Sequence, residues 1–460
     1  MFNVKDFGAI GDGVAKDQVA LQSAIDACHA AGGGKVVVPA GTYLTGTIYL
    51  KDFVHLELLP GAVIFGSPDL EEYNAPDAWP QNWTSVIEKA NGRHLVVGVE
   101  VSHVTISGGG RIDGNRAAFF DPYKYTRANF PGTRPSHTVY FVESDHVVLE
   151  NIEIFNATYW SCFLHGCEDV RIRGVNIRND LKTWNGDGLD IDCCRRVTVS
   201  DCNIVGSDDC IAIRADCRRL KDQTRACEDI TITNCVLQNR EAGIRFGVGN
   251  GIIRRCCVAN LAIRSGMGIV IHSDYADDSV RDKTIRPPAS DRDGTDISEL
   301  VISNLHMVTR IPFIIMSNYV ANPRESTKVT IRDVMIRGVR AHGNNTTVIQ
   351  GNHDMSVRNI NFSDIDLVMH KGEGIANWKA AANCSERFAA NRPYAFYATN
   401  VVGLHFNNVR LSWGDDVIPG CWTHGMLCAN VKDMTIQGSV LAAPENGKDI
   451  EQLDEWNEFI

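Results

Sequence analysis

The chain has 460 residues, of which 44% are hydrophobic, which is enough for a large core and excludes general disorder. Its formal net charge of -11 gives no reason to expect a nucleic acid as a partner. It has neither an apolar run long enough to cross a bilayer nor a secretory apolar stretch near Met1, so we expect a cytoplasmic protein without a membrane partner.

The first predicted element is a helix that begins after Asp17, a residue type favoured at helix N-caps. Three consecutive glycines, Gly32–Gly34, end it. Between these limits apolar residues recur at helical spacing: Ala20, Leu21, Ala24, Ile25, Ala27 and Cys28. The end of a solenoid exposes apolar core and needs a cover, so we interpret residues 1–45 as an N-terminal cap region.

Short stretches rich in β-branched residues recur along the rest of the chain. Neighbouring stretches commonly begin roughly 23 to 33 residues apart, and few helical periods lie between them. They include Val147–Leu149, Val170–Ile172, Val197–Val199, Ile230–Ile232, Leu300–Ile302, Val329–Ile331 and Met434–Ile436. This pattern predicts an all-β solenoid over 1–460 as a single domain, with apolar side chains inside each coil and polar ones outside.

Three insertions interrupt the repeat. They are residues 71–94, which carry Trp79 and Trp83, a polar stretch at 274–296, and residues 371–398 with further aromatic residues. Long loops on one face of a solenoid commonly build its binding site. For 274–296 a disordered surface loop is an equally good interpretation.

The chain contains fifteen cysteines, an odd number, in no zinc-binding pattern. Two pairs are direct neighbours, Cys193-Cys194 and Cys256-Cys257. We therefore expect small buried packing residues in a reducing compartment rather than a disulfide framework. No motif calls for a cofactor or a structural metal, and we expect none.

Two acidic motifs lie about one repeat apart. The first spans Asn185–Gly188 and the second Ser207–Cys210. Equivalent positions on neighbouring coils of a solenoid stack at about 4.8 Å. The spacing therefore predicts that Asp187 lies close to Asp208 and Asp209.

Three carboxyl groups so close together cannot all ionise cheaply, so at least one should keep its proton at a raised pKa. Such a cluster offers an acid for a leaving group and a base for water, the two roles that glycoside hydrolysis needs. Either motif alone is more often a turn, and the shared register favours a site. Calcium binding is the other functional interpretation, although the spacing does not match an EF-hand loop.

Across most of its length the chain resembles glycoside hydrolase family 28, the polygalacturonase family. Both acidic motifs match, as N-T-D-G and G-D-D-C-I-A-I-K in the family. Further family-like stretches are Val4–Gly13, Gly32–Gly41, Ile112–Asn115 and Tyr159–His165.

The resemblance implies a right-handed parallel β-helix and hydrolysis with inversion of anomeric configuration. By it, Asp208 is the general acid, while Asp187 and Asp209 position and activate water. An inverting arrangement holds its acid and base carboxyls about 6.5–9.5 Å apart. The implied partner is a cell-wall oligosaccharide or polysaccharide of pectic type, galacturonate-containing or rhamnogalacturonan-like; the oligomeric state stays open.

The chain departs from the family at two further motifs. Ala242 stands where the histidine of G-H-G belongs, and Val270 and His272 replace the cations of R-I-K. In the family these residues support the acid and bind the galacturonate carboxylate, so we expect a specificity altered from ordinary polygalacturonase. Strand alternation points Arg245 and His272 outward, where they are able to bind a sugar.

The candidate substrate-binding residues are Arg245, His272, Asn185, Arg214 and Glu241. An ion pair with Glu241 is the alternative for Arg245, and a solvated side chain is the alternative for His272. The tryptophans of the 71–94 insertion are expected to close one end of the groove that binds the substrate, which favours exo-action.

Two other functions fit a parallel β-helix. A polysaccharide lyase needs a base at the scissile sugar and often Ca²⁺, and Lys182 and Arg214 are its candidate bases. A non-catalytic carbohydrate-binding β-helix fits the two degraded motifs. Three clustered carboxylates suit attack by water better, so hydrolysis is the leading hypothesis.

Overall fold

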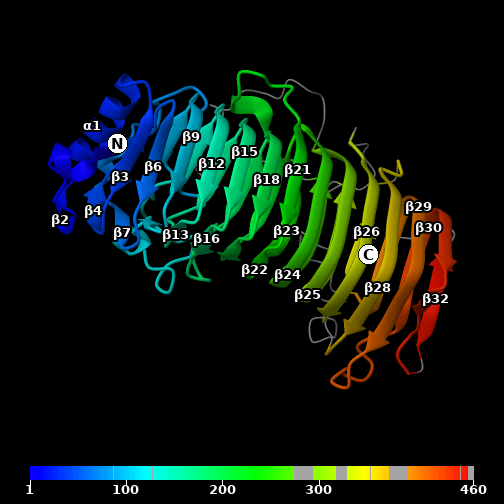
Figure 1. Cartoon of the computed structure of the whole chain (residues 1–460). Coiled ribbons are helices and arrows are strands. Elements are labelled where there is room, and N and C mark those ends of the chain that lie inside the picture. The colour runs from blue at the N-terminus through cyan, green and yellow to red at the C-terminus, as the bar shows by residue number, and fades with distance from the viewer. Residues whose placement is uncertain are drawn as a thin grey trace. The chain divides into compact units, whose positions relative to one another are not determined.

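The computed structural model describes residues 1–85, 88–126, 128–273, 294–317, 329–352, 354–371, 392–445 and 447–453. These residues fall into two compact units, over 1–240 and over 241–453. In each unit the strands pair in parallel with strands of the neighbouring coil (Figure 1). The predicted all-β solenoid is confirmed.

The coils of the first unit build three parallel sheets. The first sheet consists of β5 (Ile48–Tyr49), β8 (Val96–Val99), β11 (Val139–Val142), β14 (Cys162–His165), β17 (Leu189–Asp192) and β20 (Ile211–Ala215). The second consists of β1 (Phe2–Asn3), β3 (Gly34–Val38), β6 (Val54–Leu58), β9 (Ser102–Ser107), β12 (Asp145–Glu150), β15 (Glu168–Arg173), β18 (Arg195–Ser200) and β21 (Cys227–Thr233). The third consists of β2 (Asp12–Lys16), β4 (Gly41–Thr45), β7 (Ala62–Gly66), β10 (Arg111–Asp113), β13 (Glu153–Phe155), β16 (Asn176–Arg178), β19 (Asn203–Val205) and β22 (Val236–Gln238).

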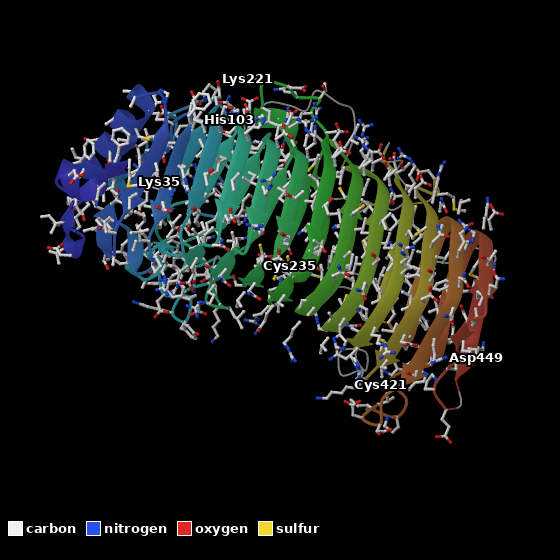
Figure 2. All side chains as sticks on the ribbon, viewed as in Figure 1. Lys35, His103, Lys221, Cys235, Cys421 and Asp449 are labelled. Carbon is white, nitrogen blue, oxygen red and sulfur yellow. The ribbon has the colours of Figure 1, made fainter. Side chains whose placement is uncertain are left out.

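Alternation along each strand explains how these coils stack. In β18, Val197 and Val199 are fully buried while Thr198 between them is exposed. Val197 pairs in register with Val170 on one side and Ile230 on the other, so the same kind of apolar side chain repeats from coil to coil inside the solenoid. Polar side chains such as Lys35 and His103 stand out from the ribbon (Figure 2).

The helix near the N-terminus is α1 (Gln18–Ala30), and it buries the predicted apolar stripe apart from Ala27. Asp17 occupies the N-cap position, but its carboxylate does not cap the helix. It accepts hydrogen bonds from the backbone N–H groups of Ile10 and Gly11, at 2.6 and 2.9 Å. Short 3₁₀ turns also occur, at η1 (Val4–Phe7), η2 (Leu70–Glu72), η3 (Arg116–Ala118) and η4 (Cys217–Arg219). Within the described ranges, no helix has both the length and the apolar character that a membrane span requires.

The second unit has longer strands. They are β23 (Ala242–Gly249), β24 (Ile252–Ser273), β25 (Asp296–Ser317), β26 (Ile331–Gly343), β27 (Thr347–Gln350), β28 (Val357–Met369), β29 (Tyr394–Trp413), β30 (His424–Gln437), β31 (Val440–Leu441) and β32 (Lys448–Leu453). The strand β24 runs for 22 residues because it bends at Arg255 and Asn260 without losing its pairing to β25. Both residues have left-handed backbone conformations, near φ 53° and 57°.

Most of two predicted insertions lies outside the described residues, namely 274–293 of the stretch 274–296 and 372–391 of the stretch 371–398. The insertion at 71–94 is described except for residues 86 and 87. The cysteines that the structure describes are free thiols, and all of them except Cys257 are buried, as expected for packing residues.

Candidate active site

The two acidic motifs stack on neighbouring coils of the first unit. Leu189 of β17 pairs with Ile211 of β20, which places Asp187 in line with Asp209. The Gly188 N–H donates to the Asp209 carbonyl at 2.9 Å and fixes this register one residue away. The predicted register is therefore confirmed.

Asp187, Asp208 and Asp209 form one cluster, in which one carboxylate oxygen of each lies within 4.8 Å of the others. Asp187 and Asp209 are only 5% and 4% exposed, while Asp208 is half-buried. The closest oxygens are thus nearer than the separation of about 6.5–9.5 Å usual between the two carboxyls of an inverting pair.

The raised pKa expected within this cluster falls on Asp187. Burial is the main cause, and the negative charges of Asp190, Asp208, Asp209 and Glu88 add to it. Asp187 therefore holds a proton to a higher pH than a solvent-exposed aspartic acid does. The resemblance gives the acid role to Asp208, whereas the carboxyl whose pKa burial raises here is that of its neighbour Asp187.

Close backbone approach explains the glycines of the first motif. A Cβ atom at Gly188 would lie 2.3 Å from the Cys210 carbonyl oxygen, and one at Gly186 would lie 2.3 Å from the Ser207 hydroxyl oxygen. Asn185, with φ near 48°, is in the left-handed region that asparagine tolerates. The motif is a tight turn and an acidic site at once, so the two interpretations of its sequence do not compete.

Two further acids follow on the outward positions of β17. Asp190 is fully buried, and neither of its carboxylate oxygens has a hydrogen-bond partner among the residues described. Burial raises its pKa well above the usual range, and the positive charge of Arg214 opposes that rise. Asp192 is also buried and accepts a hydrogen bond from the Asp216 N–H at 2.7 Å. Sequence reasoning missed both residues, although the alternating Leu-Asp-Ile-Asp sequence of β17 is a signal that could have found them.

Arg214 is held inside the protein. Its Nε lies 3.2 Å from a carboxylate oxygen of Asp192. Its guanidinium sits over the ring of Trp160 at 4.6 Å and over that of Trp83 at 5.5 Å. With these contacts it neutralises buried acids, and it is 7% exposed.

The inserted segment 71–94 covers the outward face of the first sheet beside the acidic cluster. Trp83, 3% exposed, packs on Trp160 and Phe163 with ring centroids 5.4 and 5.5 Å apart. Trp79 stacks on Tyr140 at 6.0 Å. Arg219 also anchors the segment, because it donates to the backbone carbonyl of Asn82 at 2.9 Å.

Glu88 in this segment reaches the first acidic motif. The Asn185 Nδ2 donates to Glu88 Oε1 at 3.1 Å, and the Tyr159 hydroxyl donates to Glu88 Oε2. Arg134, fully buried, donates to the Glu88 backbone carbonyl at 3.0 Å and to Asn185 Oδ1 at 3.3 Å. Sequence reasoning missed Glu88 because no spacing rule connects an insertion to a turn far along the chain.

The second unit contains Glu241, Arg245 and His272. Glu241 is exposed and Arg245 is half-buried between the fully buried Ile244 and Phe246, as strand alternation predicts. His272 is 1% exposed, so the alternative of a solvated side chain is wrong, and sugar binding by His272 stays a prediction.

An apolar cluster explains the burial of His272. The register partner of His272 on β25 is Met316, which belongs to this cluster. Ala242 and Val270, which replace the family's polar residues, belong to it too. Its members are Ala242, Met267, Val270, Ile311, Ile314, Met316, Val348, Tyr394, Tyr397 and Leu427.

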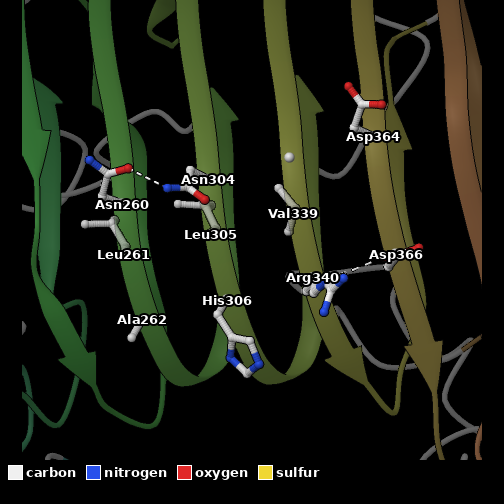
Figure 3. Close-up of a pocket in the computed structure, with 11 residues that line it drawn as sticks. Asn260, Leu261, Ala262, Asn304, Leu305, His306, Val339, Arg340, Asp364 and Asp366 are labelled. Carbon is white, nitrogen blue, oxygen red and sulfur yellow. Dashed lines mark hydrogen bonds and ion pairs between the residues drawn. The ribbon is translucent and has the colours of Figure 1, made fainter.

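A groove of about 650 Å³ crosses β24, β25, β26 and β28 of the second unit (Figure 3). Its polar side chains bond to one another: Asn304 donates to Asn260 at 2.6 Å, and Arg340 pairs with Asp366 at 3.6 Å. It includes none of the candidate catalytic or substrate-binding residues.

Among the residues that the structure describes, two groups have the composition of a metal site. The three catalytic candidates are one of them, since carboxylate oxygens suit hard cations. The other is His103, Asp145 and His146 on the surface. The two imidazole rings of that group stack 4.2 Å apart at an angle of 7°, so their in-plane lone pairs run parallel and do not converge on one ion.

Comparison with known proteins identifies the family. Residues 28–386 match the family model of the glycosyl hydrolases family 28. A probable polygalacturonase of Vitis vinifera is 26% identical over 283 residues, which are 54% of this chain and only 57% of the grape protein.

Two solved structures share the fold. A hyperthermoactive exopolygalacturonase from Thermotoga maritima has a TM-score of 0.66 at 21% identity and covers 80% of this chain and 86% of its own. A family 28 exopolygalacturonase of Yersinia enterocolitica has a TM-score of 0.69 at 17% identity and covers 94% and 78%. They confirm the right-handed parallel β-helix, and, because the family model spans well over half of its residues, the chain belongs to family 28 of the glycosyl hydrolases.

Proposed function

We propose that the chain is an inverting, exo-acting glycoside hydrolase for a pectic oligosaccharide, galacturonate-containing or rhamnogalacturonan-like. The observation that carries this proposal is the cluster of Asp187, Asp208 and Asp209, with oxygens within 4.8 Å of one another. Asp208 is the most accessible of the three and protonates the leaving oxygen, while Asp187 and Asp209 position and activate water.

The 71–94 segment supports exo-action. An endo-acting enzyme needs a groove that is open at both ends of the acidic cluster. Here Trp79 and Trp83 lie on the outward face of β11 and β14, the strands that precede the cluster in the first sheet. Sugar units are therefore excluded from that face, and the chain end of the substrate stops near the cluster.

The second unit supports an altered specificity. Val270 and Ala242 are apolar and buried where the family resemblance calls for a cation and a histidine. A uronate carboxylate gains nothing from such groups. Arg245, which is half-buried and is the register partner of Val270, is the remaining candidate for binding an anionic sugar in this strand pair.

The test is hydrolysis of a panel of defined pectic oligosaccharides, followed by NMR from the first turnover. We expect single end units to be released and the first anomer to have the inverted configuration. A retained configuration would contradict inversion, and early internal cleavage would contradict exo-action. An unsaturated product would identify a lyase instead.

Asp208→Asn tests the role of the acid. The amide keeps the size of the side chain but carries no acidic proton, so we expect turnover to fall by about 10³-fold or more. The melting temperature and the affinity for the oligosaccharide should remain close to those of the unaltered protein. Unchanged turnover would remove Asp208 from the acid role.

A further inference from the structure

We propose that Glu88 is a positioning residue for the acidic cluster: the inserted segment 71–94 holds the Asn185–Gly188 turn and sets a negative charge beside Asp187. This inference rests on the proposed hydrolytic function. It assigns to the insertion a part in the chemistry in addition to its closing of the groove.

Glu88 contacts both the turn and Tyr159, which precedes β14 on the preceding coil. One carboxylate oxygen accepts a hydrogen bond from the Asn185 side chain at 3.1 Å, and the other accepts from the Tyr159 hydroxyl. Asn185 is two residues before Asp187, and its left-handed backbone leads directly into the glycine turn. A shift of Asn185 therefore moves the Asp187 carboxyl.

Arg134 joins Glu88 and Asn185 through further hydrogen bonds. Its guanidinium donates to the carbonyls of Thr158 and Trp184, both at 2.7 Å, and to the Glu88 carbonyl at 3.0 Å. The same side chain also reaches Asn185 Oδ1 at 3.3 Å. The segment, the turn and the residues that precede β14 are thus tied to one buried cation, which fixes the position of the Glu88 carboxylate.

The charge of Glu88 acts on Asp187 together with its other neighbours. The groups that face Asp187 are Asp190 on β17, Asp208 and Asp209 on the following turn, Glu88 on the segment and the Tyr159 hydroxyl. Arg214, the cation beside Asp190, is paired with Asp192. The negative charge of Glu88 raises the pKa of Asp187, so removal of the Glu88 charge lowers that pKa.

Two variants separate the effect of the Glu88 hydrogen bonds from the effect of its charge. Glu88→Gln keeps a side chain of equal size that can bond to Asn185 and Tyr159, but it has no charge. Glu88→Ala removes both. Asp77→Asn is the matched control, because Asp77 is an exposed carboxylate of the same segment.

We expect Glu88→Gln to move the acid limb of the pH–kcat profile, which reports the base, to lower pH by about 0.5 to 1 unit. Glu88→Ala should lower kcat about 100-fold with KM changed by less than about threefold, because a misplaced carboxyl reacts slowly even when the substrate binds. The Gln variant should recover most of that loss. Asp77→Asn should match the unaltered enzyme in every measurement.

A purely structural role for Glu88 predicts another pattern. Both variants would then be less stable or have a higher KM, and the pH profile would not move. That result overturns the proposal. A second measurement does not depend on turnover: carboxyl ¹³C NMR titration of Asp187, assigned with Asp187→Asn. A lower Asp187 pKa in Glu88→Gln supports the inference and an unchanged one overturns it, even if the unaltered protein cleaves no pectic oligosaccharide and the proposed function fails.

Discussion

At the scale of single residues, the site brings together acid groups whose burial lowers the stability of the folded protein. Asp187 and Asp190 are both buried, and burial raises the pKa of each. A carboxyl whose pKa is higher in the folded than in the unfolded state binds more protons when folded. Its contribution to the free energy of unfolding therefore becomes unfavourable as the pH rises above the unfolded value near 4.

Asp190→Asn should for this reason stabilise the protein at neutral pH. The amide carries no charge to bury, so we expect the free energy of unfolding at pH 7 to increase by about 1–3 kcal/mol. The gain should shrink as the pH falls towards about 4, where the unfolded aspartic acid is also protonated. Urea unfolding at the two pH values measures it. A loss of stability at pH 7 would mean that attraction to Arg214 outweighs the cost of burying the Asp190 charge.

At the scale of elements, the 71–94 segment is attached to the first sheet through a buried histidine. His94 Nε2 lies 2.7 Å from Asn82 Oδ1, and its Nδ1 accepts a hydrogen bond from the His137 N–H at 3.2 Å. Its ring stacks on Tyr140 at 4.4 Å. Burial lowers the pKa of His94 to about 3, so the segment is held by a neutral imidazole.

This histidine should make the protein sensitive to acid. Below pH 6.5 the histidine binds a proton in the unfolded state but not in the folded state. Its contribution to the free energy of unfolding therefore falls as the pH drops. At pH 5 the loss from His94 is about 2 kcal/mol. We expect His94→Gln to be less stable at pH 7, because packing is lost, but to lose less stability than the unaltered protein between pH 7 and 5. Equal losses in both proteins, measured by denaturant unfolding, would contradict a buried neutral His94.

Some of these elements were predictable from sequence and others were not. The solenoid and the meeting of Asp187 with Asp208 and Asp209 follow from a repeat length, because parallel pairing in register converts a sequence interval into a spatial neighbour. Alternation assigns Arg245 and His272 to a face but cannot tell whether that face is covered, so it did not predict that His272 is buried. Glu88 comes from an irregular segment, where no period relates sequence to position.

At the scale of the whole molecule, the state of the cysteines indicates whether the fold depends on a reducing or an oxidising environment. Cys167, Cys194 and Cys227 occupy equivalent places on three neighbouring coils, one residue before paired positions of β15, β18 and β21. All three are buried free thiols. Stacked in this way, small sulfur-containing side chains fill the solenoid interior as packing groups.

The stability of the protein should therefore be independent of a reductant. We expect melting temperatures with and without dithiothreitol to agree within about 1 °C, since no disulfide joins the cysteines in the described parts of the chain. In the native protein Cys257 should react rapidly with a thiol reagent, and the buried thiols should react only on unfolding. All fifteen cysteines should titrate after denaturation without reductant. A smaller number would reveal a disulfide, and the chain would then owe part of its stability to an oxidising environment rather than to packing alone.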